Sequence, residues 1–242
     1  MNAIVETPYT RAWQQLGASL SRPDAVLAIS AHWLVDGTAI TAMPQPRTIH
    51  DFGGFPRKLH EAEYPAPGDP ELAAAIADFL SPLPVSLDAS WGLDHGVWSI
   101  LMHAFPAADI PVLELSIDAR KPPSFHLELG ARLAPLRERG ILLLGSGNIV
   151  HNLERFEVRA TQPFDWAVRF DGYIRDALER RDDSALVNYA SHPDARLAAP
   201  DIEHFLPLLY IEGARREDDA LRFIVEGFDA GSISMRSVRF GA

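Results

Sequence analysis

Histidine is the residue type whose placement most suggests chemistry in this sequence. The chain has nine histidines, and five of them lie in short motifs that combine the histidine with polar, glycine or aromatic residues. The five contexts are Ser30-Ala-His32-Trp33, Ile49-His50-Asp51-Phe52-Gly53-Gly54, Gly92-Leu-Asp94-His95-Gly96, Gly147-Asn-Ile-Val-His151-Asn152 and Glu203-His204-Phe205. Neutral imidazole is the commonest protein ligand for transition metals, and ligands distant in sequence can converge in a fold. The pattern indicates metal chemistry, although a single histidine is more often a core or surface residue than a ligand.

Several common catalytic signatures are absent from the sequence. Gly145-Ser-Gly-Asn148 is followed by no Gly-Lys-Ser/Thr, so it is not a phosphate-binding loop. His60-Glu61 does not begin a His-Glu-x-x-His motif, because Tyr64 stands where the second histidine would be. No Gly-x-Ser-x-Gly elbow and no dinucleotide fingerprint is found. These absences disfavour an NTPase, a serine hydrolase, a zincin peptidase and a dehydrogenase.

Composition excludes further classes of protein. The 242 residues carry 22 basic and 33 acidic side chains, a net charge of −11, which disfavours binding to a nucleic-acid backbone. The lack of cysteine excludes disulfides, thiolate metal sites and cysteine nucleophiles. The sequence shows no apolar run long enough to span a bilayer and no signal peptide. We therefore expect a cytoplasmic protein with neither nucleic-acid nor membrane partners, and the sequence does not indicate its oligomeric state.

The elements that must position the histidines alternate between helices and strands. Helices are expected over residues 8–22, 70–80, 97–105, 123–139, 165–180, 184–190 and 203–213. Strands are expected over residues 25–31, 38–43, 85–87, 110–117, 141–144, 221–226 and 232–240. The aromatic and proline-rich stretch from residue 44 to 70 is expected to be an ordered, functional loop.

This alternation predicts the α/β class, as a single domain over residues 1–242 with a central mixed sheet flanked by helices. Ligands of such sheets bind beyond the carboxyl ends of the strands. His32 follows one apolar strand and the loop carrying His151 follows another, which is the first indication of a site.

The histidine contexts, in their order and spacing, resemble the 4,5-DOPA extradiol dioxygenase family. That family belongs to the class III extradiol ring-cleaving dioxygenases, alongside the β subunit of protocatechuate 4,5-dioxygenase. The shared motifs, which run almost the full length of the chain, are Ser30-Ala-His-Trp33, Thr48-Ile-His-Asp-Phe-Gly-Gly-Phe-Pro56, Tyr64-Pro-Ala-Pro-Gly68, Leu93-Asp-His-Gly-Val-Trp98, Asp109-Ile-Pro111, Gly145-Ser-Gly-Asn148, His151-Asn-Leu153 and His204-Phe-Leu-Pro-Leu208. Each motif alone is weak, and eight in the right order are specific.

The resemblance implies a metal centre. It makes His32 and His204 metal ligands, and it places His151 beside the metal as a further ligand or as an acid–base group. The implied metal is non-haem Fe(II), and zinc can occupy the site in purified protein. Carboxylates can orient imidazoles at a metal centre. Asp94, beside His95, and Glu203, beside His204, either have this role or are solvated charges.

The resemblance also implies a reaction, the opening of a catechol ring such as that of DOPA with dioxygen to a muconic semialdehyde. His95 and His151 are the implied catalytic residues, because a histidine of near-neutral pKa suits proton transfer to and from a catechol. His50, Asp51 and Phe52 are implied to line the substrate pocket. The partners are then a small-molecule catechol and dioxygen. The tryptophans at positions 33, 91 and 98 either flank the substrate ring or, as is commoner, pack in the core.

The start of the chain departs from the family pattern. Family members begin with a short strand ending in His-Gly-Ser-Pro, whose histidine is the first metal ligand. Met1-Asn2 aligns just after that motif, so the resemblance implies a chain that is N-terminally truncated relative to the family. A start codon assigned too late and a genuine loss of the site are the alternatives. We expect weaker metal binding and an apolar sheet edge open to self-pairing.

Two other functions stay open at this point. A zinc hydrolase could use His32, His151 and His204 with a bound water as nucleophile, although the sequence offers no general base at a known spacing. A non-catalytic binding protein on the same scaffold is the other alternative. Metal identity and oxygen uptake would separate these functions.

Overall fold

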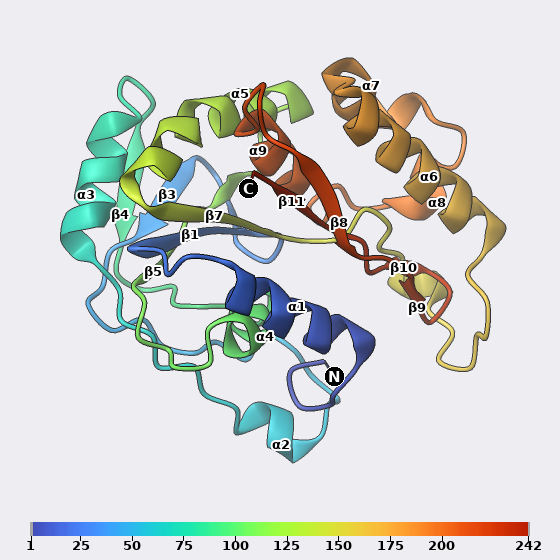
Figure 1. Ribbon diagram of the computed structural model, residues 1–242, viewed down its shortest axis with the longest axis horizontal. Helices are drawn as coiled ribbons and strands as arrows, with labels where there is room; N and C mark the ends of the chain where they lie inside the picture. The colour runs from blue at the N-terminus through green and yellow to red at the C-terminus, as the bar shows by residue number, and fades with distance from the viewer. Residues whose placement is uncertain (1, 242) are drawn as a thin grey trace. The chain divides into compact units, whose positions relative to one another are not determined.

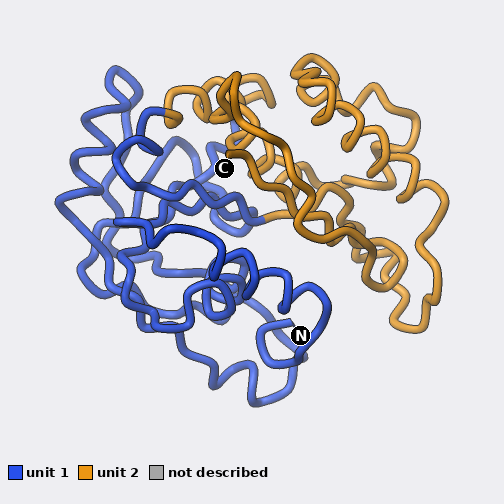
Figure 2. The backbone as a smooth tube through the Cα atoms, viewed as in Figure 1, with its two compact units in different colours: residues 1–120, 135–146 blue, residues 121–134, 147–242 orange. Residues whose placement is uncertain are grey.

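The computed structural model describes residues 2–241, and the chain divides into two compact units. Unit 1 comprises residues 1–120 and 135–146, and unit 2 comprises residues 121–134 and 147–242 (Figure 2). The chain thus passes from one unit to the other three times along its length. The expected single domain over residues 1–242 stays a prediction.

Unit 1 is built around a parallel three-stranded sheet in the order β5-β1-β7 (Figure 1). The central strand β1 (Ala25–Ser30) pairs with β5 (Val112–Glu114) and with β7 (Ile141–Ser146). All six residues of β1 are buried, as its unbroken apolar run predicted. Two smaller parallel pairs accompany this sheet and join β2 (Leu34–Val35) to β6 (Ile117–Asp118) and β3 (Thr38–Thr41) to β4 (Val85–Asp88).

The helices of unit 1 are α1 (Pro8–Ser19), α2 (Arg57–His60), α3 (Pro70–Phe79) and α4 (His95–Ala104). All but the short α2 follow a residue whose side chain caps them. Thr7 forms a capping box with Thr10, and the side chains of Asp69 and Asp94 accept backbone N–H groups at the starts of α3 and α4. Side-chain caps satisfy donors that the first helical turn leaves without a partner.

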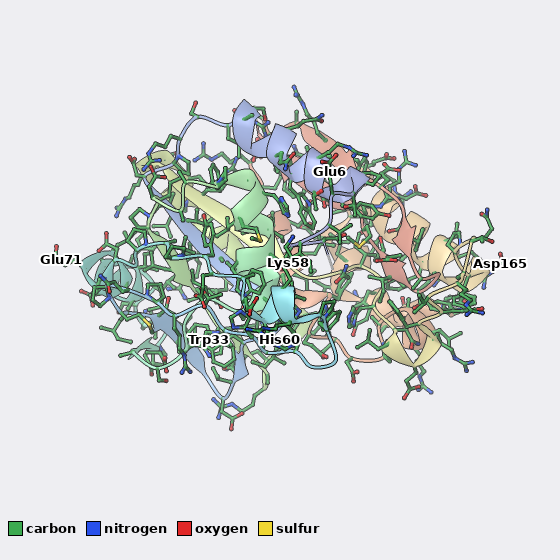
Figure 3. The ribbon with its side chains drawn as sticks, turned by 90° about the horizontal axis from the view of Figure 1, so that it is seen from below. Glu6, Trp33, Lys58, His60, Glu71 and Asp165 are labelled. Atoms are coloured by element: carbon green, nitrogen blue, oxygen red, sulfur yellow. The ribbon has the colours of Figure 1, made fainter. Side chains whose placement is uncertain are left out.

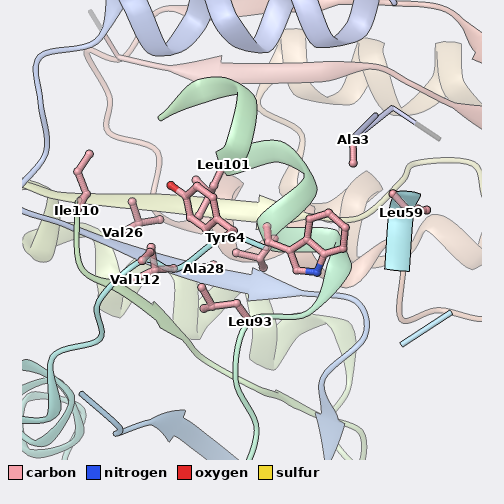
Figure 4. Packing of buried hydrophobic residues seen from close by; sticks show 12 residues of the cluster. Ala3, Val26, Ala28, Leu59, Tyr64, Leu93, Leu101, Ile110 and Val112 are labelled. Carbon is pink, nitrogen blue, oxygen red and sulfur yellow. The ribbon is translucent and has the colours of Figure 1, made fainter. Parts of the chain in front are cut away.

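One face of the central sheet packs against α4. Val26 and Ala28, two residues apart on β1, share that face and meet Leu101 of α4 in one buried cluster (Figure 4). Tyr64, from the loop before α3, joins the cluster and donates its hydroxyl to the carbonyl of Phe105 at 2.9 Å. Burial of each large apolar side chain contributes about 1.5–3 kcal/mol, so this cluster fixes α4 on the sheet.

Unit 2 contains most of the remaining helices and two antiparallel strand pairs. Its helices are α5 (Pro123–Leu133), α6 (Asp165–Arg180), α7 (Asp183–Val187), α8 (Ala195–Ala198) and α9 (Leu206–Gly213). Its strand pairs join β8 (Leu221–Val225) to β11 (Ser237–Phe240) and β9 (Phe228–Asp229) to β10 (Ile233–Ser234). Three 3-10 helices, over Ala134–Arg139, Leu153–Arg155 and Tyr189–Ser191, complete the regular structure described.

Two glycines bring α5 and α9 into close contact. A Cβ atom on Gly130 would overlap the carbonyl oxygen of Tyr210, and one on Gly213 would overlap the carbonyl oxygen of Leu127. Each helix therefore presents its bare backbone to the other, which only glycine permits at such a crossing.

The α/β class predicted from the sequence is confirmed, and several element boundaries differ. The helix expected over residues 123–139 leaves the α form after Leu133, because Pro135 lacks the N–H that would continue it. The strand expected over 110–117 divides into β5 and β6, because Leu115 bonds to β1 whereas Ser116 bonds to β3. The strand expected over 232–240 likewise divides, since β10 and β11 pair with different partners. The sheet through β1 is parallel, and the antiparallel pairs lie in unit 2.

Among residues 2–241, no helix combines the length and apolar character needed to cross a bilayer.

Candidate active site

The carboxyl end of β1 carries the first side chains of the site. Ser30 ends the strand, and His32 follows it after one residue. The hydroxyl of Ser30 donates to Asp94 Oδ1 at 2.8 Å, and the same oxygen accepts the backbone N–H of Gly96 at 2.9 Å. His32 Nδ1 lies 3.2 Å from Asp94 Oδ1. The residue that caps α4 therefore also holds the imidazole of His32.

A second carboxylate, Asp51, joins two imidazoles. Its Oδ1 accepts the backbone N–H of His95 at 3.0 Å and lies 2.8 Å from His95 Nδ1, and its Oδ2 lies 3.2 Å from His32 Nδ1. The rings of His32 and His95 stack with their centroids 4.2 Å apart and an interplanar angle of 20°. One ligand atom from each of His32, Asp51 and His95 lies within 4.8 Å of the others, so the three side chains form a candidate metal site.

The electrostatics of this group follow from its two carboxylates. Burial lowers the pKa of His32, but the hydrogen bonds and charges of Asp51 and Asp94 outweigh burial and raise the pKa to about 9. Burial raises the pKa of Asp51, but its hydrogen bonds from His32 and His95 outweigh this effect and hold the pKa well below its usual range. The two carboxylates therefore favour the imidazolium form of His32, so a metal that binds His32 competes with a proton.

The donor set fits the metal that the sequence implies. Imidazole and carboxylate side chains are the ligand types of non-haem Fe(II) sites that keep open positions for substrate and oxygen, and within this group His32 is the residue that the resemblance makes a ligand. The same donors also suit zinc. The Nδ1 atom of His32 faces two carboxylates, which leaves Nε2 as the ligand atom, an arrangement common among metal-binding histidines.

Aromatic side chains lie beside His95. The ring of Phe52 meets that of His95 edge-on at 5.1 Å, and it also lies 4.9 Å from the ring of His60 on α2, which is labelled in Figure 3. His50 donates Nε2–H to the carbonyl of Ala62 at 2.9 Å, and its ring centroid lies 5.7 Å from that of Trp98. Phe52 thus offers an apolar face at the metal group, whereas His50 supports the loop. His60 was not singled out from the sequence, since a lone histidine on a short helix gives no signal there.

The tryptophans follow the commoner of their two expected roles. Trp33 and Trp98 are 3% and 0% exposed, so they pack in the core. Trp33 and Trp91 stack with their ring centroids 5.7 Å apart, and Trp98 donates Nε1–H to the carbonyl of Ile49 at 2.8 Å.

Unit 2 brings the other two predicted ligands together. The rings of His151 and His204 stack with centroids 3.5 Å apart and an interplanar angle of 6°. Backbone bonds fix both residues, because His204 accepts from Asn148 N–H and His151 donates to the carbonyl of Ala198. Their sharing of one metal with His32 of unit 1 stays a prediction.

The carboxylate partners of the histidines differ from those that adjacency in the sequence suggested. Asp94 adjoins His95 but bonds to His32, and His95 is held by Asp51, which the sequence analysis placed in the substrate pocket. The capping of α4 by Asp94 turns its side chain back towards the end of β1, which a short-range motif does not reveal. No motif singled out the buried carboxyl of Glu114 behind Asp94.

Comparisons with known proteins identify the family to which the chain belongs. The chain matches the family described as the catalytic LigB subunit of aromatic ring-opening dioxygenase over residues 5–241. It is similar to the 4,5-DOPA dioxygenase extradiol of Escherichia coli (strain K12), with 46% identity over 246 residues that cover 100% of this chain and 91% of that protein. The protein of the same name from Beta vulgaris is 36% identical over 236 residues, covering 96% of this chain and 88% of that one.

A solved structure shares the fold. The crystal structure of the uncharacterized protein JW3007 from Escherichia coli K12 superposes with a TM-score of 0.86 at 42% identity, covering 97% of this chain and 93% of that one. The match to the family model extends over nearly the whole chain, and the relatives are enzymes by name. The chain therefore belongs to the LigB family of aromatic ring-opening dioxygenases and is an extradiol ring-opening dioxygenase.

Proposed function

We propose that this enzyme opens the aromatic ring of a catechol such as DOPA with dioxygen, in an Fe(II)-dependent reaction that yields a muconic semialdehyde. The relatives from Escherichia coli and Beta vulgaris that bear the name 4,5-DOPA dioxygenase extradiol support this substrate. The observation that carries the proposal is the group of His32, Asp51 and His95, with Phe52 beside it.

His32 is the metal ligand that the resemblance and the geometry both support. Its Nδ1 donates to carboxylates, which fixes the ring and increases the basicity of Nε2. For His151 and His204 the support is the resemblance, together with their adjacency inside unit 2. When bound, Fe(II) would be chelated by the two catechol oxygens and would supply the path by which electron density reaches dioxygen.

His95 is the acid–base residue in this proposal. Its Nδ1 donates to Asp51 Oδ1 at 2.8 Å, so Nε2 is left to take a proton from a catechol hydroxyl and to return it later. The ionised Asp51 stabilises the imidazolium form that exists between these two transfers. The side chain of His95 is 35% exposed, which gives a substrate access to the ring. His151 is the second candidate for proton transfer.

Phe52 and its neighbours provide the recognition of an aromatic substrate. A planar catechol ring stacks or packs edge-on with aromatic side chains at a gain of about 0.5–1.5 kcal/mol per pair. Phe52 already makes such contacts with His95 and Phe55, and Phe55 is 42% exposed. His50 and Asp51 support this aromatic surface indirectly. His50 binds the loop carbonyl of Ala62, and Asp51 binds the imidazole of His95.

The test is an oxygen-uptake assay after anaerobic reconstitution with Fe(II). DOPA or a simpler catechol is added with air, and oxygen consumption is followed together with the yellow absorbance of the semialdehyde. We expect uptake and colour to rise together, to require iron and to be lost in His32→Ala. The matched control is His192→Ala, which removes a unit 2 imidazole whose Nδ1 accepts the backbone N–H of Asp194 at 3.2 Å.

The same assay separates the alternatives. A zinc hydrolase would show activity with zinc and no oxygen uptake, and a binding protein would show neither. Iron binding without any oxygen uptake would contradict the proposal. The small-molecule partners are then the catechol and dioxygen, and the cytoplasmic location expected from the sequence stays a prediction for fractionation to test.

A further inference from the structure

A second buried carboxyl group lies directly behind the site. Glu114, at the end of β5, has no exposed surface. Its Oε1 accepts the backbone N–H of Asp94 at 2.9 Å, and its Oε2 accepts the Nε1–H of Trp91 at 3.2 Å. Its own backbone N–H donates to Thr41 Oγ1 at 2.9 Å, which anchors the end of the strand. Glu114 therefore fixes Asp94, which in turn fixes His32.

The carboxyl groups of Glu114 and Asp94 interact with each other in the interior of unit 1. Asp94 is fully buried, and its Oδ1 takes the hydroxyl of Ser30, the N–H of Gly96 and the ring of His32. Its Oδ2 is also buried, and nothing among residues 2–241 donates a hydrogen bond to it. No lysine or arginine in the described chain forms an ion pair with Glu114. Two ionised carboxylates in such surroundings repel each other and lose their hydration.

One proton removes this conflict. Burial, followed by the charge of Asp94, raises the pKa of Glu114 well above its usual value. Asp94 already receives three hydrogen bonds on one oxygen, from Ser30, Gly96 and His32, and the proton that is missing lies on the side of its other oxygen. A protonated carboxyl keeps the ability to accept hydrogen bonds while it donates one O–H. Glu114 can thus accept from Trp91 and Asp94 and still donate.

We propose that Glu114 is a neutral carboxylic acid that donates a hydrogen bond to Asp94 Oδ2 and so acts as a positioning residue for His32. This inference rests on the proposed function only in taking His32 as a metal ligand. Glu114 touches neither substrate nor metal. It fixes Asp94 in the orientation that directs Nε2 of His32 to the metal and leaves the pair with a single negative charge.

The inference makes a sharp distinction between two substitutions. In Glu114→Gln, the amide N–H can donate to Asp94 Oδ2 and the amide oxygen can accept a hydrogen bond, so the substitution copies the neutral acid. In Glu114→Ala, the donor is lost and a cavity opens behind Asp94. A matched control is Asp171→Asn in unit 2, because Asp171 is also buried but pairs with a cation and accepts three hydrogen bonds from the Arg236 guanidinium.

The first measurement is infrared spectroscopy at pH 7, which reports a protonated carboxylic acid directly. All three proteins carry Glu212→Gln, because the Glu212 carboxyl, with a pKa of about 7, would itself hold a proton at this pH. In this background we expect the carbonyl band of a protonated acid when Glu114 is present, its loss in Glu114→Gln and its retention in Asp171→Asn. The second is a titration with Co(II) alone, followed by absorption. We expect Glu114→Gln to bind Co(II) within about threefold of the unsubstituted protein and Glu114→Ala to bind about 10- to 100-fold more weakly, the usual effect of removing an outer-shell partner.

Three results would overturn the inference: no band of a protonated acid, equal weakening of Co(II) binding in Glu114→Gln and Glu114→Ala, or unchanged binding in Glu114→Ala. If Glu114→Ala does not fold, the infrared band and the Co(II) affinity of Glu114→Gln decide alone. Both readouts are independent of ring cleavage. If the unsubstituted protein takes up no oxygen while the Co(II) affinities separate as expected, the proposed reaction fails and the role of Glu114 stands.

Discussion

Two carboxylates hold two imidazoles in unit 1, and each has a separate task. Asp94 is fully buried and fixes His32, whereas Asp51 is 21% exposed and contacts both His32 and His95. A buried carboxylate that receives several hydrogen bonds keeps a ligand in place. A partly exposed carboxylate beside an imidazole can stabilise the charge that appears on the ring during proton transfer.

Replacing Asp51 with asparagine is expected to reduce catalysis more than binding. The amide keeps the size of the side chain but cannot stabilise an imidazolium on His95, so kcat for oxygen uptake falls by about 100-fold or more while KM changes little. The control is Asp69→Asn, which replaces a helix cap with another good cap and keeps both parameters. A kcat for Asp51→Asn within threefold of the unsubstituted enzyme would contradict the role of Asp51.

Glu212 on α9 makes stability depend on pH. Burial raises its pKa to about 7 against the opposing charge of Arg215, with Asp183 raising it further and Arg181 lowering it. The folded state thus holds a proton that the unfolded state releases near pH 4.5, so the contribution is complete below pH 4.5 and is lost as pH rises towards 7. The loss amounts to about 1.4 kcal/mol per pH unit at most.

The measurement for Glu212 is urea unfolding between pH 4.5 and 7.5. Glu212→Gln removes the titrating group, and we expect the free energy of unfolding to fall less steeply with pH in this variant. Glu179→Gln, at a side chain that is 44% exposed, serves as the control and leaves the slope unchanged. Equal slopes in Glu212→Gln and the unsubstituted protein would show that another group governs this range.

At the scale of single residues, the sequence predicted more of the site's members than of their contacts. His32, Asp51 and His95 were all singled out, and they meet as one group. The contact of Asp94 with His32 depends on how α4 starts, and that of Glu114 with Asp94 depends on which strand lies beside β1. Both depend on tertiary structure, which local spacing does not encode.

Secondary-structure elements in unit 2 depend on close backbone contact. Because Gly130 and Gly213 lie at the crossing of α5 and α9, alanine at either position would push the helices apart. We expect Gly130→Ala and Gly213→Ala each to lower the free energy of unfolding by about 1–3 kcal/mol, the usual cost of overpacking.

The matched control is Gly172→Ala on α6, where an added Cβ meets nothing within 4 Å. Alanine has the higher helix propensity, so this variant is expected to gain up to about 1 kcal/mol. Urea unfolding of the three variants measures these differences. Stabilisation of all three by similar amounts would show that the crossing of α5 and α9 relaxes freely.

Element boundaries were predictable where local chemistry sets them and not where pairing does. The start of α1 at Pro8 and its cap at Thr7 follow from residue types alone. The apolar stretch from 110 to 117 gave no sign that its hydrogen bonds pass from β1 to β3 within two residues. A strand that changes partner keeps the composition of a continuous strand.

For the molecule as a whole, the site couples metal binding to folding. A ligand that binds only the folded state adds about 2.7 kcal/mol at a concentration 100 times its Kd. We expect Fe(II) or zinc to raise Tm and chelation to reverse the rise, as followed by differential scanning fluorimetry. The rise should vanish in His32→Ala and persist in His192→Ala. A metal-dependent rise in His32→Ala would place the ion elsewhere.

The α/β class was predictable at this scale, because the periodicity of the apolar residues indicates the alternation of helices and strands. The division into two units was not. It separates residues 121–134 from the neighbours on both sides, and no change of composition marks those boundaries. Units that exchange segments in this way carry no linker for a sequence to reveal.

The central position of β1 has a consequence for the protein during its synthesis. β1 leaves the ribosome early, but Val26 pairs with Val112 and Ala25 pairs with Ile141, so its second neighbour arrives only after more than half of the chain. Until then an apolar strand is exposed to other nascent chains and can pair with them. We therefore expect rapid expression to divert chains into aggregates, and slower translation or a chaperone that shields residues 25–30 to increase the yield of folded protein.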